Sequence, residues 1–195
     1  MALPDAVLGR VLSTNRAMNL TIRPTTGADL PEVLSVLDDA AAWLQSIGMT
    51  EQWPRVISDD ATWVARVSRF AAEGRFYVAH RGGVTAGVFH LRDEPGLDGG
   101  PGAFWAVQEL QQPAVYLFQL AVRRWVAGSG VAAAMLDWAF ELARGQGRVL
   151  RLDCWAGNEK LRRYYLEHDF GHLGDVTAHG IDGRYYEVSR FERGR

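Results

Sequence analysis

The sequence predicts a single α/β domain, and three observations lead to this class. Segments with the two-residue alternation of strands and segments with the 3.6-residue periodicity of helices follow one another in the order β-α-α-β-β-β-α-β-α-β-β. A buried strand, a small-residue turn and an amphipathic helix occupy residues 114–144 in direct succession. The chain has 195 residues, of which 48% are hydrophobic, which suits one domain with a substantial core.

Charge and cysteine content exclude several classes of protein. The net charge is −2 with both signs interspersed, so no basic surface for nucleic acid or anionic membrane is expected. The single cysteine, Cys154, excludes an internal disulfide, fits a reducing cytoplasm and is expected to be a buried packing residue. Residues 1–16 lack a signal-peptide pattern, and no apolar run approaches the length of a membrane span. We therefore expect a cytoplasmic protein without nucleic-acid or membrane partners.

The first third of the chain predicts one strand and two helices. Residues 1–19 are weakly patterned and are expected to form an N-terminal extension to a single domain over residues 20–195. A strand over residues 20–23 ends at Pro24. Thr26 and Asp29 have the spacing of a capping box, and the helical stripe that follows ends near Gly48. A connector over residues 51–54 leads to a second helix over about residues 59–72.

The middle and end of the chain predict six strands and two helices. Strands over residues 76–79 and 84–91 flank Gly82-Gly83, a two-residue hairpin turn. Residues 93–112 form a long loop, which in a compact domain is mobile or functional. Residues 115–122 have apolar side chains on both faces, as a doubly buried strand does, and a helix begins at Val131. A strand over residues 149–155, a helix opened by Asn158, and a strand pair over residues 170–176 and 185–191 complete the chain.

The turn Ala127-Gly128-Ser129-Gly130 predicts a phosphate-binding cradle. The first N–H groups of a helix have no internal acceptor, its dipole favours an anion there, and glycines let a phosphate approach the main chain. A Walker loop would need Lys-Ser/Thr where Val131-Ala132 stands. A dinucleotide-binding unit would lie earlier in a chain, although its fingerprint tolerates Ala133 in place of the third glycine. A glycine turn without a ligand is the alternative.

Two segments resemble the signature motifs of the GNAT superfamily of acyl-CoA-dependent N-acyltransferases. The first is Leu120-Ala121-Val122 followed by Ala127-Gly128-Ser129-Gly130-Val131-Ala132, with Ala127 in place of the usual Arg or Gln. The second is Asn158-x-x-Leu161-x-x-Tyr164-Tyr165-x-x-x-Asp169-Phe170, with Leu161 replacing Ala and Asp169 replacing Gly. The element order from Leu20 to Phe191 is also similar. The resemblance implies the GNAT fold, with a mixed central sheet of about seven strands and four helices.

By this resemblance the chain is an N-acetyltransferase that transfers the acetyl group of acetyl-CoA to a primary amine by direct attack in a ternary complex, without a metal. The main chain at Leu120, Ala121 and Val122 would bind the pantetheine arm. Asn158 would contact the cofactor or, equally, cap its own helix. The backbone N–H groups that would bind the diphosphate belong to Gly128, Ser129, Gly130, Val131, Ala132 and Ala133.

Tyr165 matches the tyrosine that the family uses as general acid toward the leaving thiolate, since a phenol stays protonated until a thiolate forms. A purely packing role is the alternative. The general base is less clear, because the strand positions where some members carry His or Glu hold Tyr116, Phe118 and Gln119. Asp153 is the first candidate. It could instead pair with an arginine such as Arg151, and a water chain could replace a side-chain base.

His90 and Glu109 are further candidate bases, ranked after Asp153. His168 and His172 have a spacing seen in metal sites, but Phe170-Gly171 interrupts the helix between them and no third ligand is evident, so no metal is expected.

The acceptor pocket is expected between the first two helices, their connector and the loop over residues 93–112. An aromatic wall near an acid suits a small cationic amine. Two alternatives are a catalytically silent acyl-CoA-binding module and a protein N-terminal or lysine acetyltransferase, and a homodimer is left open. The predicted wall residues are Trp43, Gln52, Trp53, Trp105, Tyr116 and Trp155.

Overall fold

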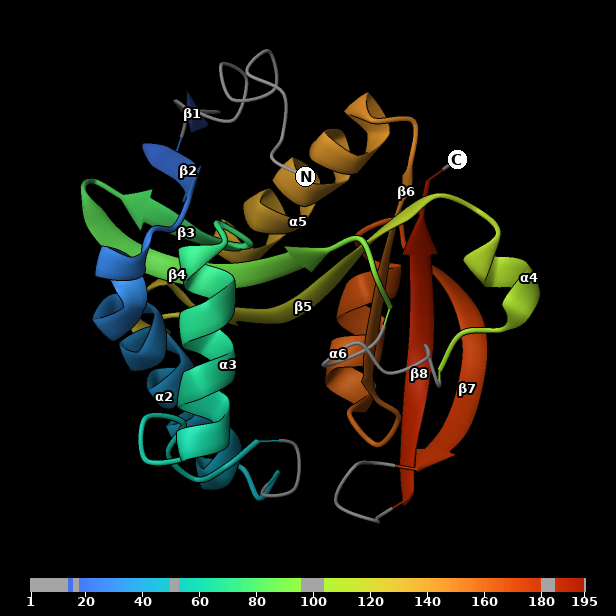
Figure 1. The fold of residues 1–195 in the computed structure, drawn as a ribbon, viewed down its shortest axis with the longest axis horizontal. Helices are drawn as coiled ribbons and strands as arrows, with labels where there is room; N and C mark the ends of the chain where they lie inside the picture. The colour runs from blue at the N-terminus through green and yellow to red at the C-terminus, as the bar shows by residue number, and fades with distance from the viewer. Residues whose placement is uncertain (1–13, 16–17, 50–52, 96–103, 180–184, 195) are drawn as a thin grey trace. The chain divides into compact units, whose positions relative to one another are not determined.

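The computed structural model describes residues 14–15, 18–49, 53–95, 104–179 and 185–194 (Figure 1). The chain forms two compact units, each assembled from two separate stretches of sequence. The first unit combines residues 1–90 with 119–138, and the second combines residues 91–118 with 139–195. Gln52, predicted to line the acceptor pocket, lies outside the described residues.

The first unit contains an antiparallel array of strands. β2 (Leu20–Pro24) pairs with β3 (Phe76–Arg81), which pairs with β4 (Val84–Arg92). The short strand β1 (Thr14–Asn15) pairs with β2, within the segment expected to be an extension. Gly82 and Gly83 have φ values of 59° and 83°, which confirms the predicted two-residue turn between β3 and β4.

Helices cover both faces of this array. α2 (Leu30–Ser46) and α3 (Ala61–Ala72) lie side by side (Figure 1). They share a core cluster with Val78 and Val88 of the sheet. Tyr77 and Phe89 stack at 5.2 Å on the other face, where Trp138 of α5 (Val131–Gly145) lies 4.9 Å from Tyr77. Successive strand residues point to opposite faces, so burial on both sides explains why β3 and β4 are apolar almost throughout.

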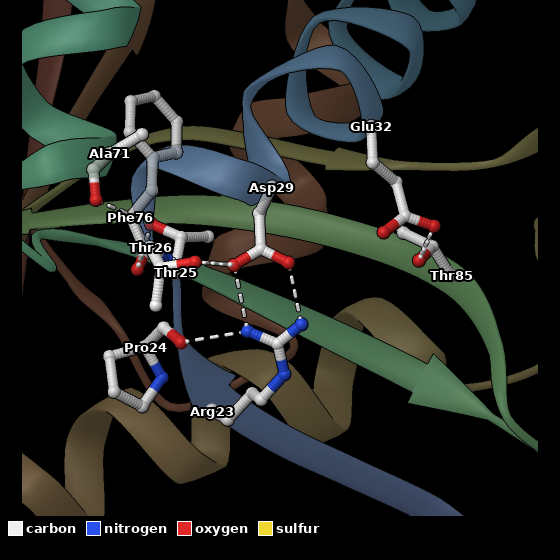
Figure 2. A network of polar contacts seen from close by, with 9 residues as sticks. All are labelled: Arg23, Pro24, Thr25, Thr26, Asp29, Glu32, Ala71, Phe76 and Thr85. Atoms are coloured by element: carbon white, nitrogen blue, oxygen red, sulfur yellow. Dashed lines mark hydrogen bonds and ion pairs between the residues drawn. The ribbon is translucent and has the colours of Figure 1, made fainter.

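The predicted capping box stands at the start of the first helical segment (Figure 2). Thr26 N–H donates to Asp29 Oδ2 at 2.7 Å, at the 3₁₀ turn η1 (Gly27–Asp29) that precedes α2. Arg23 of β2 donates to both oxygens of Asp29 at 2.9 and 2.6 Å, which holds the pKa of that carboxyl well below its usual range. Thr25 Oγ1 donates to the Ala71 carbonyl at 3.2 Å. These bonds fix the end of β2 against the start of α2 and the end of α3.

The second unit contains a mixed array of strands. Residues 114–117 of β5 (Ala114–Val122) pair in parallel with residues 149–152 of β6 (Val149–Trp155). β6 pairs antiparallel with β8 (Tyr185–Arg193), and β8 pairs antiparallel with β7 (Gly171–His179). α6 (Glu159–Leu166) follows β6, and the four-residue α4 (Val107–Leu110) lies within the predicted long loop. The last residues of β5, from Gln119 onward, belong to the first unit.

The predicted fold is confirmed in element order and in the mixed strand pairing, and the described residues contain four helices of eight residues or more. Two short elements, β1 and α4, were not predicted, because neither is long enough to show a period. Within the described residues, none of the helices combines the length and the apolar character that crossing a membrane requires.

Candidate functional site

The turn between β5 and α5 presents a group of backbone donors. Gly128 and Gly130 have φ values of 76° and 83°, a conformation that side chains disfavour. Inside the turn, the Ser129 N–H donates to the Val126 carbonyl at 3.1 Å. A Cβ placed on Gly128 would meet nothing within 4 Å, so the space before it is open. In the described part of the chain, no acceptor is bonded to the N–H groups of Gly128, Gly130, Val131, Ala132 and Ala133.

Close contact between β4 and β5 within the first unit fixes the strand that leads into this turn. The Arg123 N–H donates to the Ala86 carbonyl at 2.8 Å. A Cβ on Gly87 would lie 2.7 Å from the Ala121 carbonyl oxygen, so only glycine allows this approach. Ala121 is buried, whereas Leu120 and Val122 are half-buried. The predicted Leu-Ala-Val segment is therefore held by main-chain contacts immediately before the turn.

The second unit carries both predicted catalytic side chains on neighbouring elements. Asp153 of β6 is half-buried, and burial raises its pKa to about 6. Tyr165 of α6 is 5% exposed and its ring lies 5.4 Å from Phe191. Burial, together with the nearby Cys154 and Asp153, raises the pKa of Tyr165. The raised pKa keeps the Tyr165 phenol protonated at neutral pH, and the raised pKa of Asp153 lies closer to neutrality than that of an ordinary carboxyl.

Arg151 does not pair with Asp153, which removes one alternative. Its guanidinium, 1% exposed, is bonded to Glu192 Oε2 at 2.9 Å and to the Glu109 carbonyl at 2.6 Å. Within the described residues no hydrogen bond or ion pair engages the Asp153 carboxylate. Two candidate bases are otherwise engaged: Glu109 pairs with Arg190 at 2.5 Å, and His90 is fully buried between aromatic rings of the first unit's core. Asp153 therefore stays the candidate base.

Asn158 is the N-cap of α6, which is one of the two roles predicted for it. Its Oδ1 accepts from the Leu161 N–H at 3.1 Å, and the residue is 5% exposed. Cys154 is buried, as expected, and burial raises the pKa of its thiol to about 12. Such a thiol is a poor nucleophile, because the reactive thiolate forms only at high pH.

The predicted aromatic wall divides between the two units. Trp105 and Tyr116 are 5% and 3% exposed and pack together in a core cluster of the second unit. Their contacts explain their burial, so these two side chains serve packing. Trp43, Trp53 and Trp155 are half-buried: Trp43 lies under the Arg124 guanidinium at 4.7 Å, and Trp53 lies 6.0 Å from Trp63.

The sequence did not predict the arginine network of the second unit. Arg151 and Arg190 each place a guanidinium near the Trp105 ring, at 5.3 and 5.8 Å, and both bind Glu109. This network anchors α4 and so gives order to part of the predicted long loop. No sequence signal indicated it, because Glu109 and Arg190 are 81 positions apart. Among the described residues, no group of three or more His, Cys, Asp or Glu could hold a metal ion.

Comparisons with known proteins show the family to which the chain belongs. The model of the acetyltransferase (GNAT) family matches residues 39–171, which is more than half of the chain. The chain belongs to the GNAT acetyltransferase family. It is accordingly an acyltransferase. No curated protein matched the chain in a sequence comparison.

Solved structures share the fold of this GNAT protein at low sequence identity. A GNAT-family acetyltransferase from Listeria monocytogenes has a TM-score of 0.68 at 22% identity, covering 89% of this chain and 95% of its own. YncA from Salmonella typhimurium, solved with its cofactor acetyl-CoA, has a TM-score of 0.59 at 17% identity, covering 90% and 93%. Ribosomal-protein-alanine N-acetyltransferase from Brucella melitensis has a TM-score of 0.56 at 20% identity, covering 89% and 99%.

Proposed function

We propose that this GNAT protein transfers the acetyl group of acetyl-CoA to the primary amine of a small molecule, by direct attack in a ternary complex. The observation that carries the proposal is a set of N–H groups around the start of α5 that have no bonded acceptor among the described residues, in the turn that follows the strand of Leu120-Ala121-Val122. Several N–H donors that converge at a helix N-terminus suit a diphosphate. The open space before Gly128 leaves room for one.

The chain's own groups have distinct roles in this proposal. The N–H groups of Gly128 and of residues 130–133 hold the diphosphate, and the main chain of residues 120–122 bonds the pantetheine arm as an added strand would. Bound acetyl-CoA supplies the acetyl group as an activated thioester. Asp153 accepts a proton from the attacking amine, and Tyr165 donates its phenolic proton to the departing sulfur. The raised pKa of Asp153 makes it a stronger base than an ordinary carboxylate, and the raised pKa of Tyr165 keeps its phenol protonated until a thiolate forms.

The acceptor is proposed to be small and cationic. Trp53 and Trp155 each keep part of their indole surface exposed, and flat aromatic faces attract ammonium groups. The Trp43 ring already carries the Arg124 guanidinium. A protein N-terminus or a lysine side chain is the alternative acceptor, and a silent acyl-CoA-binding module is the alternative function.

The test combines binding with turnover. Titration calorimetry should detect acetyl-CoA binding, and a thiol-detecting assay should record free CoA with some member of a panel of small amines and N-terminal or lysine peptides. Release of free CoA with small amines supports the proposal in full. Release of free CoA with peptides alone indicates a protein acceptor. Binding of acetyl-CoA without release of free CoA indicates the silent module. The absence of acetyl-CoA binding would overturn the proposal.

A further inference from the structure

We propose that Arg81 binds a diphosphate oxygen of the cofactor and supplies the positive charge that the GNAT turn lacks at Ala127. This inference rests on the proposed binding of acetyl-CoA. Arg81 is the last residue of β3, beside the Gly82-Gly83 hairpin turn, and is 48 positions before the turn that it contacts.

A direct contact places Arg81 at the turn. Arg81 Nη1 donates to Ser129 Oγ at 3.0 Å, and Ser129 Oγ in turn donates to the Val126 carbonyl at 2.7 Å. The hydroxyl thus accepts from the guanidinium while it is anchored to the turn's own main chain. Ser129 lies between the two glycines with positive φ, so Arg81 is bonded to the turn that carries these N–H groups.

The two arginines nearest the turn in sequence are engaged elsewhere in the first unit. Arg123 donates to the Ser35 carbonyl and hydroxyl at 3.0 and 2.9 Å, both on α2. The Arg124 guanidinium lies over the Trp43 ring, also on α2, at 4.7 Å. These contacts hold both cations against α2. Arg81, which no motif predicts, is the arginine with a side-chain bond to the turn.

Arg81 has donors to spare for an anion. A guanidinium carries five N–H groups in a planar fork that matches phosphate oxygens. Within the described residues, its bond to Ser129 is its only hydrogen bond, and no carboxylate neutralises it. An unneutralised cation beside a set of free N–H groups attracts an anion through both charge and directed hydrogen bonds. Since these N–H groups are those assigned to the diphosphate, Arg81 is assigned to the same group.

The test compares three ligands with successively fewer phosphates: acetyl-CoA, its 3′-dephospho form and S-acetylpantetheine. Dissociation constants are measured by calorimetry for wild type, Arg81→Ala and Arg81→Lys, at low and high salt. Arg81→Ala should weaken binding of the first two ligands about tenfold at low salt, as expected for one charge-assisted bond at a partly exposed site. It should leave S-acetylpantetheine unaffected, and Arg81→Lys should recover part of the loss.

A matched control is Arg55→Ala, which removes the same charge from an exposed site of the same unit and should change none of the constants. Melting temperatures without ligand establish that each variant is folded. Equal affinity of wild type and Arg81→Ala for acetyl-CoA would overturn the inference. The inference would also be overturned if Arg81→Ala weakened the binding of acetyl-CoA but not of its 3′-dephospho form, because Arg81 would then contact the ribose phosphate. Failure of wild type to bind any of the three would instead overturn the proposed function.

Discussion

At the scale of single residues, the ring of Tyr165 is expected to serve packing and its hydroxyl is expected to serve proton transfer. Its ring contacts Phe170 and Phe191 in the second unit, while its hydroxyl has no hydrogen bond to another described residue. Removal of the hydroxyl should therefore leave the core intact and remove a proton donor. This makes Tyr165→Phe an informative substitution.

Tyr165→Phe is expected to lower kcat by about 10²–10⁴-fold, the usual contribution of a positioned acid or base. The affinity for acetyl-CoA and the melting temperature should change little, since the ring is retained. Steady-state kinetics with the acceptor found by the amine panel, together with calorimetry, measures both. Unchanged turnover would leave Tyr165 with a packing role alone.

Asp153 should impose a pH dependence on both activity and stability. Its pKa of about 6 is above the ordinary value, so the folded state favours the protonated carboxyl. The folded protein then binds more protons than the unfolded chain between about pH 4 and 6, and the free energy of unfolding decreases as the pH rises through that range. A base with this pKa also loses activity as the pH falls through about 6.

Asp153→Asn is expected to remove the acidic limb of the rate profile and to lower the rate on the plateau. It should raise the melting temperature at pH 7, where wild type holds a half-buried charge, and the increase should disappear below about pH 4. Scanning calorimetry and rate profiles from pH 4 to 9 give both readouts. An unchanged profile would exclude Asp153 as the base.

At the scale of elements, the turn before α5 can be tested with two matched glycines. Gly128 and Gly48 have φ values of 76° and 79°, and at neither would a Cβ meet an atom within 4 Å. Each change to alanine should therefore cost a similar amount of stability, about 1–2 kcal/mol. Only Gly128→Ala should also weaken acetyl-CoA binding, because its methyl group occupies the proposed diphosphate space. Calorimetry measures the affinity of both variants for acetyl-CoA. Equal affinities would contradict the assignment of the diphosphate to this turn.

The arginine network around α4 should contribute strongly to stability. Arg151→Ala leaves Glu192, 15% exposed, without its cation, and such a loss costs about 3–5 kcal/mol. Arg144 makes an exposed pair with Glu141 at 2.5 Å, so Arg144→Ala is the matched control and should leave the melting temperature unchanged. Urea unfolding of both variants measures the difference. Similar midpoints would show that the buried network is not the main anchor of α4.

Regular elements could be predicted from the sequence, and most long-range contacts could not. The periodicity of β3 and α5 follows from burial of their faces, so their type and order were predictable. The turn at Gly128 was predictable because local backbone geometry demands glycine. Trp105 was expected in a pocket wall because of its position in a loop, but it packs beside two arginines that come from distant strands. Arg81 was missed for the same reason: its partner is 48 residues away, and no local pattern encodes the pair.

At the scale of the whole molecule, the first unit depends on two separate stretches of chain. Residues 1–90 contain β1 to β3 and most of β4, with α2 and α3, but Ala121 and Trp138, which pack on them, come from residues 119–138. A fragment of residues 1–90 is therefore expected to lack a cooperative thermal transition, because one face of its strands is left uncovered. Circular dichroism and amide NMR dispersion measure this. A sharp transition in the fragment would show that its own helices suffice.

Because the first unit is built from two separate stretches of chain, it stays incomplete during part of protein synthesis. The ribosome releases residues 1–90 first, yet Tyr77 and Phe89 cannot be covered by α5 until Trp138 has been added. At about 5–20 residues per second, the nascent chain waits roughly 2–10 s with that aromatic face exposed to water. During this interval the face is a binding surface for chaperones and a site for aggregation. Slow codons that are translated while residues 91–138 leave the ribosome prolong the exposure, and they should lower the soluble yield more than slow codons translated after these residues have emerged.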